Sequence, residues 1–432
     1  MELVKLTEKE FKKFALNHPQ ANFYQTVEWG HLKETNNWCI HLLGLKNKNK
    51  IVAGCMLLSK TTPIKRKMFY SPRGFLIDYN DYDLLKEFTK QIKDYVKKEK
   101  GIFIKIDPNI IYQERDIDGN IVENGENNYK AYENLIKLKY KHFGFNLMQE
   151  TLQPRWIYVI PTKGISDEEI LANMDQVARK VIRRNEKNHI KCREIGYDEL
   201  EEFKNIMQHT GDRRGFIDRP LSYYQNMYNN LSNSNMIKVM LVELHVKESI
   251  ETMSKEKEEI EKDRAERQRL HDEKIVNMKE DKYNKKIEEL TNSIEKITKK
   301  IEEMTKIQED NGDVLVLGGV LFIPYGKEVL ALLGGSYKEY MNFESAYNIY
   351  YELIKYANHH GYERCNLYGI TGDFKESNPL YNLYAFKRKF SGNVEELIGE
   401  FDLVINKPLY LAYKVAFGLY HGAKTIKNKI KR

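Results

Sequence analysis

Hydrophobic residues between positions 245 and 310 recur at the spacing of a coiled coil. In the second half of this segment they follow one another at steps of three and four: Ile287, Leu290, Ile294, Ile297, Ile301, Met304 and Ile307. These steps place apolar side chains on one helix face. Because no Gly or Pro occurs between Pro220 and Gly312, the pattern predicts an antiparallel helical hairpin that turns near Asn277. A solvated spacer is the alternative, because the charges of the segment are mixed.

Outside this segment, one order of predicted elements occurs twice. In the first half, strands are expected at 37–46, 50–63, 67–72 and 102–107, with helices at 81–100 and 129–144. In the second half, strands are expected at 237–244, 314–326, 328–336 and 364–370, with helices at 343–361 and 378–386. A repeated order of this kind indicates two similar domains, and strand-strand-strand-helix-strand-helix matches the N-acetyltransferase fold.

The predicted fold class is therefore α/β (α+β), with two N-acetyltransferase-like domains and an inserted antiparallel coiled-coil hairpin. The first domain is expected to comprise residues 1–152 and to be completed by the C-terminal segment 398–432. The second is expected at 153–397, with the arm at 245–310 inserted into it. The R-x-x-G-x-G/A loop with which acyl-CoA-dependent enzymes bind phosphate is absent from both halves, so we expect an acyl donor other than acyl-CoA.

Charge separates the arm from the rest of the chain. The 432 residues carry a net charge of +7, but residues 245–310 contain 16 Lys and Arg against 19 Asp and Glu, which leaves +10 on the remainder. A basic body favours anionic partners such as phosphates, nucleic acid or a lipid surface. The four cysteines form no C-x-x-C pair and the histidines show no metal-ligand spacing, so we expect no disulfide framework and no metal. No signal peptide or transmembrane run is expected, which indicates a cytoplasmic protein.

Several segments, taken together and in order, resemble the Fem family of peptidoglycan-bridge aminoacyltransferases. They are FYQTVEWGHLK at 23–33, SPRGFLIDYND at 71–81, IKIDPN at 104–109, VARKVIRRNEKNHIK at 177–191, LLGGSYKEYMNF at 332–343 and NLYAFKRKFSGNVEELIGEFDLVINKPLYLAYK at 382–414. The resemblance extends over essentially the whole chain, and the hairpin inserted between two strands is part of it.

This resemblance implies transfer of Gly, Ala or Ser from aminoacyl-tRNA, as co-substrate and without another cofactor, to the stem-peptide amine of lipid II. The same transfer onto UDP-MurNAc-pentapeptide is the alternative acceptor reaction, and the hairpin favours lipid II. An alternative of another class is a non-catalytic coiled-coil scaffold with a degenerate acyltransferase body. A homodimer or heterodimer is compatible with each of these.

The resemblance also implies an acceptor site that holds a diphosphate and a sugar. Its residues are expected to be Lys33, Arg219, Tyr223 and Tyr340. Lys33 follows Trp29 by four residues, and Arg219 and Tyr223 form an R-x-x-x-Y pair beside Pro220. Pro220 favours a helix that starts there, so the pair would lie at a helix N-terminus, where anions bind well. A surface position is the alternative for Arg219.

Three residues are expected to serve catalysis. Asp107 ends a predicted strand before Pro108, and an Asx turn is its alternative role. Lys387 follows Phe386 in the stretch NLYAFKRKFSG. A lysine ammonium stays charged unless it is desolvated, and a charged ammonium is a poor base. Lys387 is therefore expected to stabilise an oxyanion or the tRNA 3′ end, with Phe386 stacking on the terminal adenine. If this stretch is a strand, residues 387 and 389 would lie on one face and residue 388 on the other. A solvated edge strand without a catalytic role is the alternative for the whole stretch.

Two basic segments are expected to contact polyanions. Residues 177–193 contain seven Lys and Arg against one acid, and the cations expected to bind tRNA phosphates are Arg179, Lys180, Arg183, Arg184 and Lys187. A solvated helix face is the alternative. The segment 403–432 contains seven Lys and Arg and no Asp or Glu, and aromatic and aliphatic residues lie between the cations. This composition suits a helix on the anionic inner face of the plasma membrane, and a packing helix with a basic end is the alternative.

Overall fold

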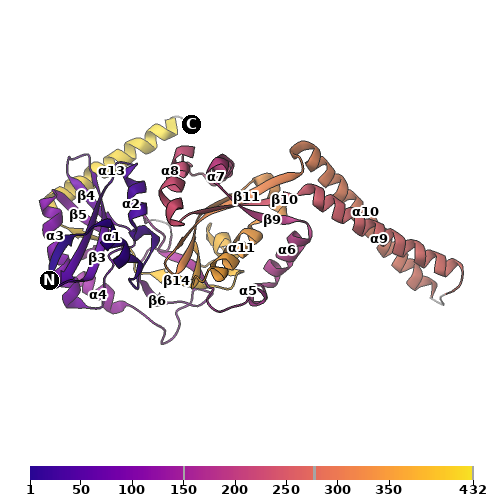
Figure 1. Cartoon of the computed structure of the whole chain (residues 1–432), viewed down its shortest axis with the longest axis horizontal. Coiled ribbons are helices and arrows are strands. Elements are labelled where there is room, and N and C mark those ends of the chain that lie inside the picture. Colours follow the sequence, from indigo (N-terminus) through magenta and orange to yellow (C-terminus); the bar gives the residue numbers. More distant parts are fainter. Residues whose placement is uncertain (149–150, 276–278, 431–432) are drawn as a thin grey trace.

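The computed structural model describes residues 1–148, 151–275 and 279–430, with side chains up to Gly418 in the last helix. Figure 1 shows a body that contains two β-sheets and a pair of long helices that projects from one end of it. The amino-terminal half forms the part of the body that lies farthest from the projecting helices.

The first sheet has seven strands in the order β1-β2-β3-β4-β5-β15-β7. Their bounds are β1 (Glu2–Lys5), β2 (Cys39–Asn47), β3 (Lys50–Thr61), β4 (Lys67–Ser71), β5 (Gly101–Ile106), β15 (Phe401–Val404) and β7 (Tyr140–His142). Only β4 and β5 pair in parallel among these strands, and α3 (Tyr82–Lys98) makes the crossover between them. The side chain of Asp81 caps α3 by accepting from the N–H of Leu84, and Leu85, Phe88, Ile92 and Val96 form its buried face.

The second sheet has eight strands in the order β6-β14-β8-β13-β12-β11-β10-β9. Their bounds are β6 (Ile111–Glu114), β14 (Asn393–Leu397), β8 (Trp156–Pro161), β13 (Arg364–Gly369), β12 (Glu328–Ser336), β11 (Val314–Tyr325), β10 (Lys238–His245) and β9 (Ile190–Ile195). Here β12 and β13 form the parallel pair, with α11 (Ala346–His359) between them in the chain. The predicted fold class, with two N-acetyltransferase-like halves and an inserted helical hairpin, is confirmed.

Helices cover the sheets and link the two halves. They are α1 (Glu8–Leu16), α2 (Val27–Glu34), α4 (Tyr129–Lys137), α5 (Asp167–Asn173), α6 (Gln176–Lys187), α7 (Leu200–Arg214), α8 (Leu221–Leu231) and α12 (Tyr381–Arg388). One apolar cluster joins α2 of the first half to α7 and α8 of the second, and it includes Trp29, Leu32, Phe203 and Tyr224. The two halves therefore share a core.

Each sheet also contains a strand from the other half of the chain. Strand β15, from the C-terminal segment, lies between β5 and β7 in the first sheet. Strand β6 lies within residues 1–152, yet it pairs with β14 at the edge of the second sheet. The chain therefore crosses between the sheets more than once.

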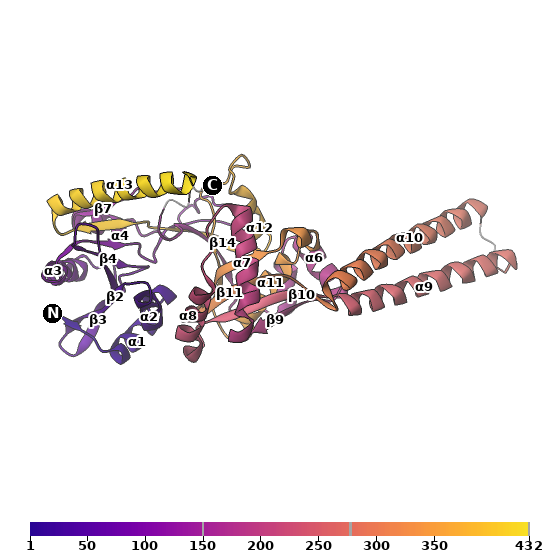
Figure 2. The ribbon, with the colours of Figure 1, turned by 90° about the horizontal axis from the view of Figure 1, so that it is seen from above.

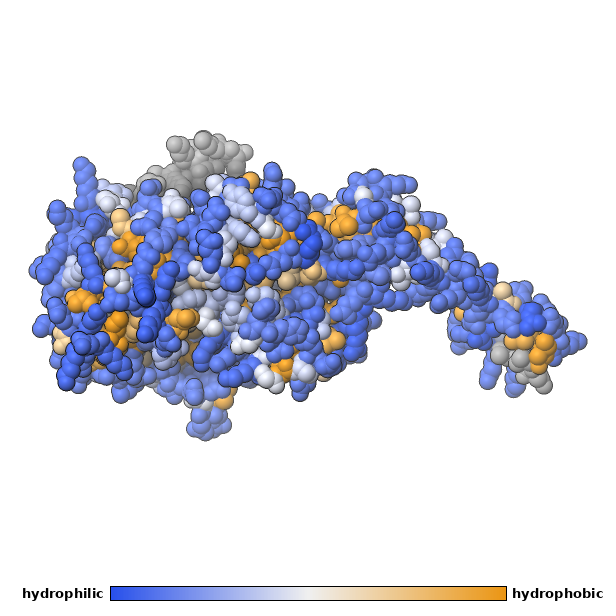
Figure 3. All heavy atoms as spheres, in the orientation of Figure 1, coloured by the Kyte–Doolittle hydropathy of each residue, from blue (hydrophilic) through white to orange (hydrophobic). Residues whose placement is uncertain are grey.

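The arm consists of α9 (Val246–Asp272) and α10 (Glu280–Asn311). At 1.5 Å per residue, their 27 and 32 residues correspond to lengths of roughly 40 and 48 Å. Apolar side chains of the arm are buried in two places. Met253 and Met304 belong to the core of the second half, and Leu290 and Ile294 are buried within the arm. Figure 3 shows a mostly hydrophilic arm surface. The expected turn position, Asn277, lies outside the described residues.

The last helix, α13 (Lys407–Ile430), packs against the first sheet. The buried rings of Tyr410 and Tyr413 lie 5.3 and 5.2 Å from the ring of Phe103 on β5. Within the described part of the chain, none of the helices combines the length and the apolar character needed to cross a bilayer.

Candidate active site

A cavity of about 1410 Å³ is lined by residues of both halves of the molecule. Its wall is built from α2, residues of β5, β12 and β13, the segment before α8, the region around Glu400, and α13. Among the residues expected to bind substrate, Lys33, Arg219 and Tyr223 all line this cavity. Segments almost 190 residues apart in the chain are thus brought to one site, as the prediction required.

Lys33 and Arg219 form a cationic end of the cavity. The Nζ of Lys33 lies 3.9 Å from the centre of the Trp29 ring, and the guanidinium carbon of Arg219 lies 5.1 Å from that of Tyr223. Burial, together with the nearby Arg219, lowers the pKa of Lys33 to about 8. Neither cation has a carboxylate partner among the described residues, and Asp218 pairs with Lys204 instead, at 2.9 Å. Two close cations without a counterion favour a polyanionic ligand.

Trp29 adds a hydrogen-bond donor at this end. Its indole N–H is buried in the cavity wall and has no hydrogen-bond partner within the described part of the chain. A buried donor without a partner is costly, so a ligand oxygen that accepts from it would be bound more tightly. Sequence reasoning used Trp29 only as the residue one turn before Lys33.

Asp107 lies behind the cavity rather than in its wall. It follows β5, and its carboxylate accepts from the N–H of Arg73 at 2.8 Å and from the hydroxyl of Tyr70 at 3.1 Å. Burial raises the pKa of Asp107 to about 6, although Arg73 opposes the shift. Tyr70 lines the cavity and Asp107 does not. The Asp107 carboxylate therefore influences the cavity by holding the Tyr70 hydroxyl and the backbone of Arg73 in place.

A chain of hydrogen bonds crosses the cavity wall between the two halves. The hydroxyl of Tyr24 lies 3.0 Å from that of Tyr368, which donates to Oε1 of Gln153 at 2.6 Å. Since Tyr368 donates to Gln153, Tyr24 donates to Tyr368. Sequence reasoning missed all three residues; the only signal was that Tyr24 and Tyr368 lie in segments already singled out, at 23–33 and 364–370.

Carboxylates also line the cavity. Lys105 Nζ lies 3.0 Å from Glu400 and 3.2 Å from Asp402, and Tyr410 donates to Asp402 at 2.7 Å. All three charged residues line the cavity. Both carboxylates together raise the pKa of Lys105 against the opposing effect of burial. This group was also missed, because its residues come from β5 and from the segment around β15.

Lys387 does not lie on a strand. It belongs to the last turn of α12, so the expected strand alternation at 387–389 is wrong: the helix runs two residues beyond the predicted end at 386 and includes Lys387 and Arg388. The Lys387 side chain is 4% exposed, and its Nζ donates to the carbonyl of Gly369 at 2.8 Å. Burial lowers its pKa to about 7. A permanent charge was expected only for an ammonium in contact with water, and that condition is not met at the buried Lys387.

Phe386 and Lys389 contact a different part of the second half. The Phe386 ring packs edge-on against Tyr347 and Tyr350 of α11, at centroid distances of 5.0 and 5.5 Å. Lys389 donates to the hydroxyl of Tyr347 at 3.0 Å. Lys387 thus points toward the end of β13, next to the cavity-lining Tyr368, while Phe386 faces an aromatic cluster.

The remaining predicted residues lie away from the cavity. Tyr340, in a short 3-10 helix at Lys338–Phe343, donates to Asn311 at the end of α10 at 3.3 Å and is not among the residues that line the cavity. Of the α6 cations, Arg184 pairs with Glu344 at 3.2 Å and Lys187 with Glu256 of the arm at 2.8 Å. The remaining α6 cations are Arg179, which donates to the carbonyls of Ala172 and Met174, and the exposed Lys180 and Arg183.

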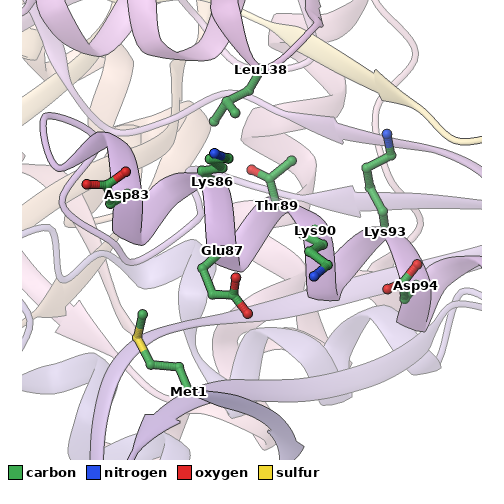
Figure 4. A pocket seen from close by; sticks show the side chains of 9 residues that line it. All are labelled: Met1, Asp83, Lys86, Glu87, Thr89, Lys90, Lys93, Asp94 and Leu138. Atoms are coloured by element: carbon green, nitrogen blue, oxygen red, sulfur yellow. The ribbon is translucent and has the colours of Figure 1, made fainter.

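Figure 4 shows a second hollow, of about 900 Å³, on the first half. It is lined by Met1, Asp83, Lys86, Glu87, Thr89, Lys90, Lys93, Asp94 and Leu138. Three acids and three lysines of α3 share this face, and none of the predicted site residues contributes to it. The interdomain cavity is the better candidate for an active site, because it contains Lys33, whose pKa burial lowers, and the Trp29 indole N–H, which has no partner among the described residues.

Comparison with known proteins identifies the family. The model of the FemAB family matches residues 6–417. The aminoacyltransferase FemA of Staphylococcus aureus strain N315 is 31% identical over 416 residues, which cover 96% of this chain and 97% of FemA, and FemA of strain RF122 shows the same identity. A crystal structure of FemX superposes with a TM-score of 0.78 at 27% identity and covers 95% of this chain and 99% of FemX. The chain belongs to the FemAB family, and it is an aminoacyltransferase.

Proposed function

We propose that this enzyme transfers Gly, Ala or Ser from aminoacyl-tRNA to the stem-peptide amine of lipid II in the synthesis of peptidoglycan interpeptide bridges. The observation that carries the proposal is the pair Lys33 and Arg219 in the wall of a cavity of about 1410 Å³. Neither cation has a carboxylate partner among the residues that the structure describes. A lipid-linked peptidoglycan precursor carries a diphosphate of matching charge, a sugar and a peptide, and the cavity is large enough to receive these parts in order.

The acceptor is oriented by its diphosphate. Charge-assisted hydrogen bonds from Lys33 and Arg219 would hold the phosphate oxygens, and the indole N–H of Trp29 would supply a further donor. The stem peptide would then extend toward the polar groups of Tyr24, Tyr368 and Gln153.

The reaction forms a C–N bond and breaks the ester bond between the aminoacyl carbonyl and the terminal ribose. The acceptor amine attacks as the neutral base, a tetrahedral oxyanion forms, and the proton lost by the amine ends on the ribose oxygen that leaves. Lys387, as an ammonium, would stabilise the developing oxyanion. With its pKa near 7, it also exists in part as the neutral amine at neutral pH. Asp107 is a positioning residue that acts through Tyr70 and Arg73.

The tRNA is proposed to approach the second half of the molecule. Lys387 lies there beside Gly369, and the exposed α6 cations Lys180 and Arg183 are available for its phosphates. No further cofactor is needed for the transfer, because the ester of aminoacyl-tRNA is already activated. The enzyme is proposed to work at the inner face of the plasma membrane, where the basic segment 403–432 would contact anionic lipid.

Incubating the purified protein with charged tRNAs and two acceptors tests the proposal. Glycyl-, alanyl- and seryl-tRNA are each combined with lipid II in detergent and with UDP-MurNAc-pentapeptide, and the product is followed by mass spectrometry. We expect transfer to lipid II from one of the three tRNAs. Transfer only to the nucleotide-linked acceptor would establish the alternative substrate, and no transfer to either would refute the proposed reaction.

A further inference from the structure

Large apolar side chains are exposed at the rim of the interdomain cavity. Ile217, in the loop between α7 and α8, is 85% exposed, and its neighbour Phe216 is 44% exposed. Phe417 of α13, which is 43% exposed, lines the same cavity. An isolated exposed apolar residue is ordinary, but several around the opening of one cavity indicate a surface that is covered by something.

The loop that carries Ile217 is held firmly at both ends. Gly215, with φ of 79°, ends α7, and its N–H and that of Phe216 both donate to the carbonyl of Gly211, at 2.8 and 3.1 Å. On the other side, Asp218 is anchored by Lys204 at 2.9 Å and accepts from Tyr224 at 2.5 Å. These contacts fix the backbone on either side of Ile217, so its side chain is presented outward by the fold itself.

A second exposed apolar strip lies on α13. Leu411 and Val415, one helical turn apart, are 57% and 64% exposed, whereas Tyr410 and Tyr413 on the inner face are buried. Lys407, one helical turn before Leu411, is exposed beside them, whereas Lys414 lines the cavity, with its Nζ 4.6 Å from the centre of the Phe143 ring. Such a helix, apolar and basic on its outer side, has the composition of an interfacial helix.

The strip and the loop lie on one side of the molecule. In Figure 1, α13, α8 and α7 reach the upper edge of the body, and Figure 2 looks down on this side from above. The cavity lined by residues of all three elements opens between them. A flat surface laid on this side would therefore touch both apolar groups and face the opening.

We propose that this side, formed by the α7–α8 loop and the outer face of α13, binds the surface of an anionic phospholipid bilayer, with Ile217 inserted beside the cavity opening. The part of this inference in which the bilayer delivers a lipid-linked acceptor rests on the proposed function. It goes beyond a basic C-terminal helix, because it adds a second contact and sets the orientation of the enzyme. A protein seated on both groups would close the opening, whereas a bilayer carries the acceptor to it.

Vesicle flotation without donor or acceptor tests the inference independently of transfer. Wild type and the variants Ile217→Asp and Val415→Asp are mixed with vesicles of phosphatidylglycerol and phosphatidylcholine, or of phosphatidylcholine alone. We expect wild type to bind the anionic vesicles more tightly, and each variant to bind them at least about tenfold more weakly, since a charged group replaces a buried apolar one. The matched control is Ile121→Asp, because Ile121 is 58% exposed but follows β6 at the lower edge of Figure 1.

A spectroscopic variant keeps the test decisive. Ile217→Trp should show a blue-shifted emission on anionic vesicles and quenching by brominated lipid, and Ile121→Trp should show neither. Equal vesicle binding by wild type and both Asp variants would overturn the inference, and so would a dimer that Ile217→Asp dissociates without any change in vesicle binding. Absence of transfer by a protein that binds vesicles as expected would count against the proposed function alone.

Discussion

The two halves of the enzyme share an order of elements but differ at their parallel strand pairs. In the first half, β4 and β5 pair from Lys67 and Gly101 to Ser71 and Ile106, where both strands end. Just beyond, the Asp107 carboxylate accepts from the Arg73 N–H. A side chain thus continues the connection between the two segments after the backbone ladder has stopped.

In the second half, the corresponding pair opens. Strands β12 and β13 pair only from Glu328 to Leu330 and from Arg364 to Asn366, although β12 continues to Ser336 and β13 to Gly369. Past the last pair, Leu332, Leu333 and Tyr368 line the cavity, and Lys387 donates to Gly369. In this repeated fold, one strand pair is closed and rigid, and the other opens to form part of the cavity wall. The predictions below test this division.

The largest effect is expected at Lys387. Replacing Lys387 by Met should lower kcat by roughly 10²–10³, because one donor to the oxyanion is lost, while acceptor KM changes little. The variant should also be more stable by on the order of 1 kcal/mol, since a buried amine with a pKa lowered to about 7 is removed. Single-turnover transfer and chemical denaturation measure the two effects.

Lys389→Met is the control for general basicity and should retain nearly full activity, and Lys387→Arg should recover only part of the rate. If the ammonium is the active form, the wild-type transfer rate falls as pH rises through about 7. Equally mild effects at Lys387 and Lys389 would mean that the opened strand pair has no catalytic role.

A smaller effect is expected at the cationic end. Lys33→Ala and Arg219→Ala should each raise acceptor KM by roughly ten- to a hundredfold with little change in kcat, because one charge-assisted contact is worth about 1.5–3 kcal/mol. Initial rates over a range of lipid II concentrations measure this. Lys60→Ala is the matched control, since Lys60 also lines the cavity but stacks on Trp38, 5.5 Å away; a similar KM for all three variants would refute the diphosphate site.

Asp107 should matter less than either, because it acts through neighbours. We expect Asp107→Asn to lower kcat about tenfold. In wild type, folding raises the pKa of Asp107 from 3.8 to about 6. The stabilisation that belongs to the protonated carboxyl is therefore complete below pH 3.8 and is lost as pH rises through about 6. Denaturation at several pH values should show this slope in wild type and not in Asp107→Asn; parallel pH profiles would contradict the assigned pKa.

The smallest effect is expected from the outer part of the arm. Replacing residues 260–298 by a short Gly-Ser linker leaves the contacts of Met253 and Met304 with the body core in place. The midpoint of thermal unfolding of the body should change by only a few degrees, and transfer should fall a few-fold if the arm contacts tRNA or a partner. Loss of the folded body, seen by circular dichroism, would show that the arm is part of the core.

The elements that the sequence predicted well are those with a clear hydrophobic period. The arm and α3 bury residues at steps of three and four, and each can be read from its own segment. Lys33, Arg219 and Tyr223 were placed together through the family resemblance, and the cavity contains all three. Strand β6 was not predicted at all, because four residues at a sheet edge carry no period of their own.

The missed residues share a physical reason. Tyr24, Gln153 and Tyr368 meet only because the two halves pack together, and Lys105 meets Glu400 only because β15 inserts beside β5. No local pattern contains such a contact. The prediction of a strand at Lys387 was wrong for a related reason. Alternating polar residues in a short segment fit a strand and a final helical turn equally well, and the packing of α12 on β8 decides between them.

The exchange of strands between the sheets has a consequence for how the chain is made. Strand β15 (Phe401–Val404) is an interior strand of the first sheet, yet the ribosome makes it long after its two neighbours, β5 and β7. While the ribosome is still translating, β5 and β7 have no strand between them, and their unpaired edges face solvent. The part of the protein that is made first is therefore completed last, and an early stop before Phe401 would leave the first sheet without its interior strand β15.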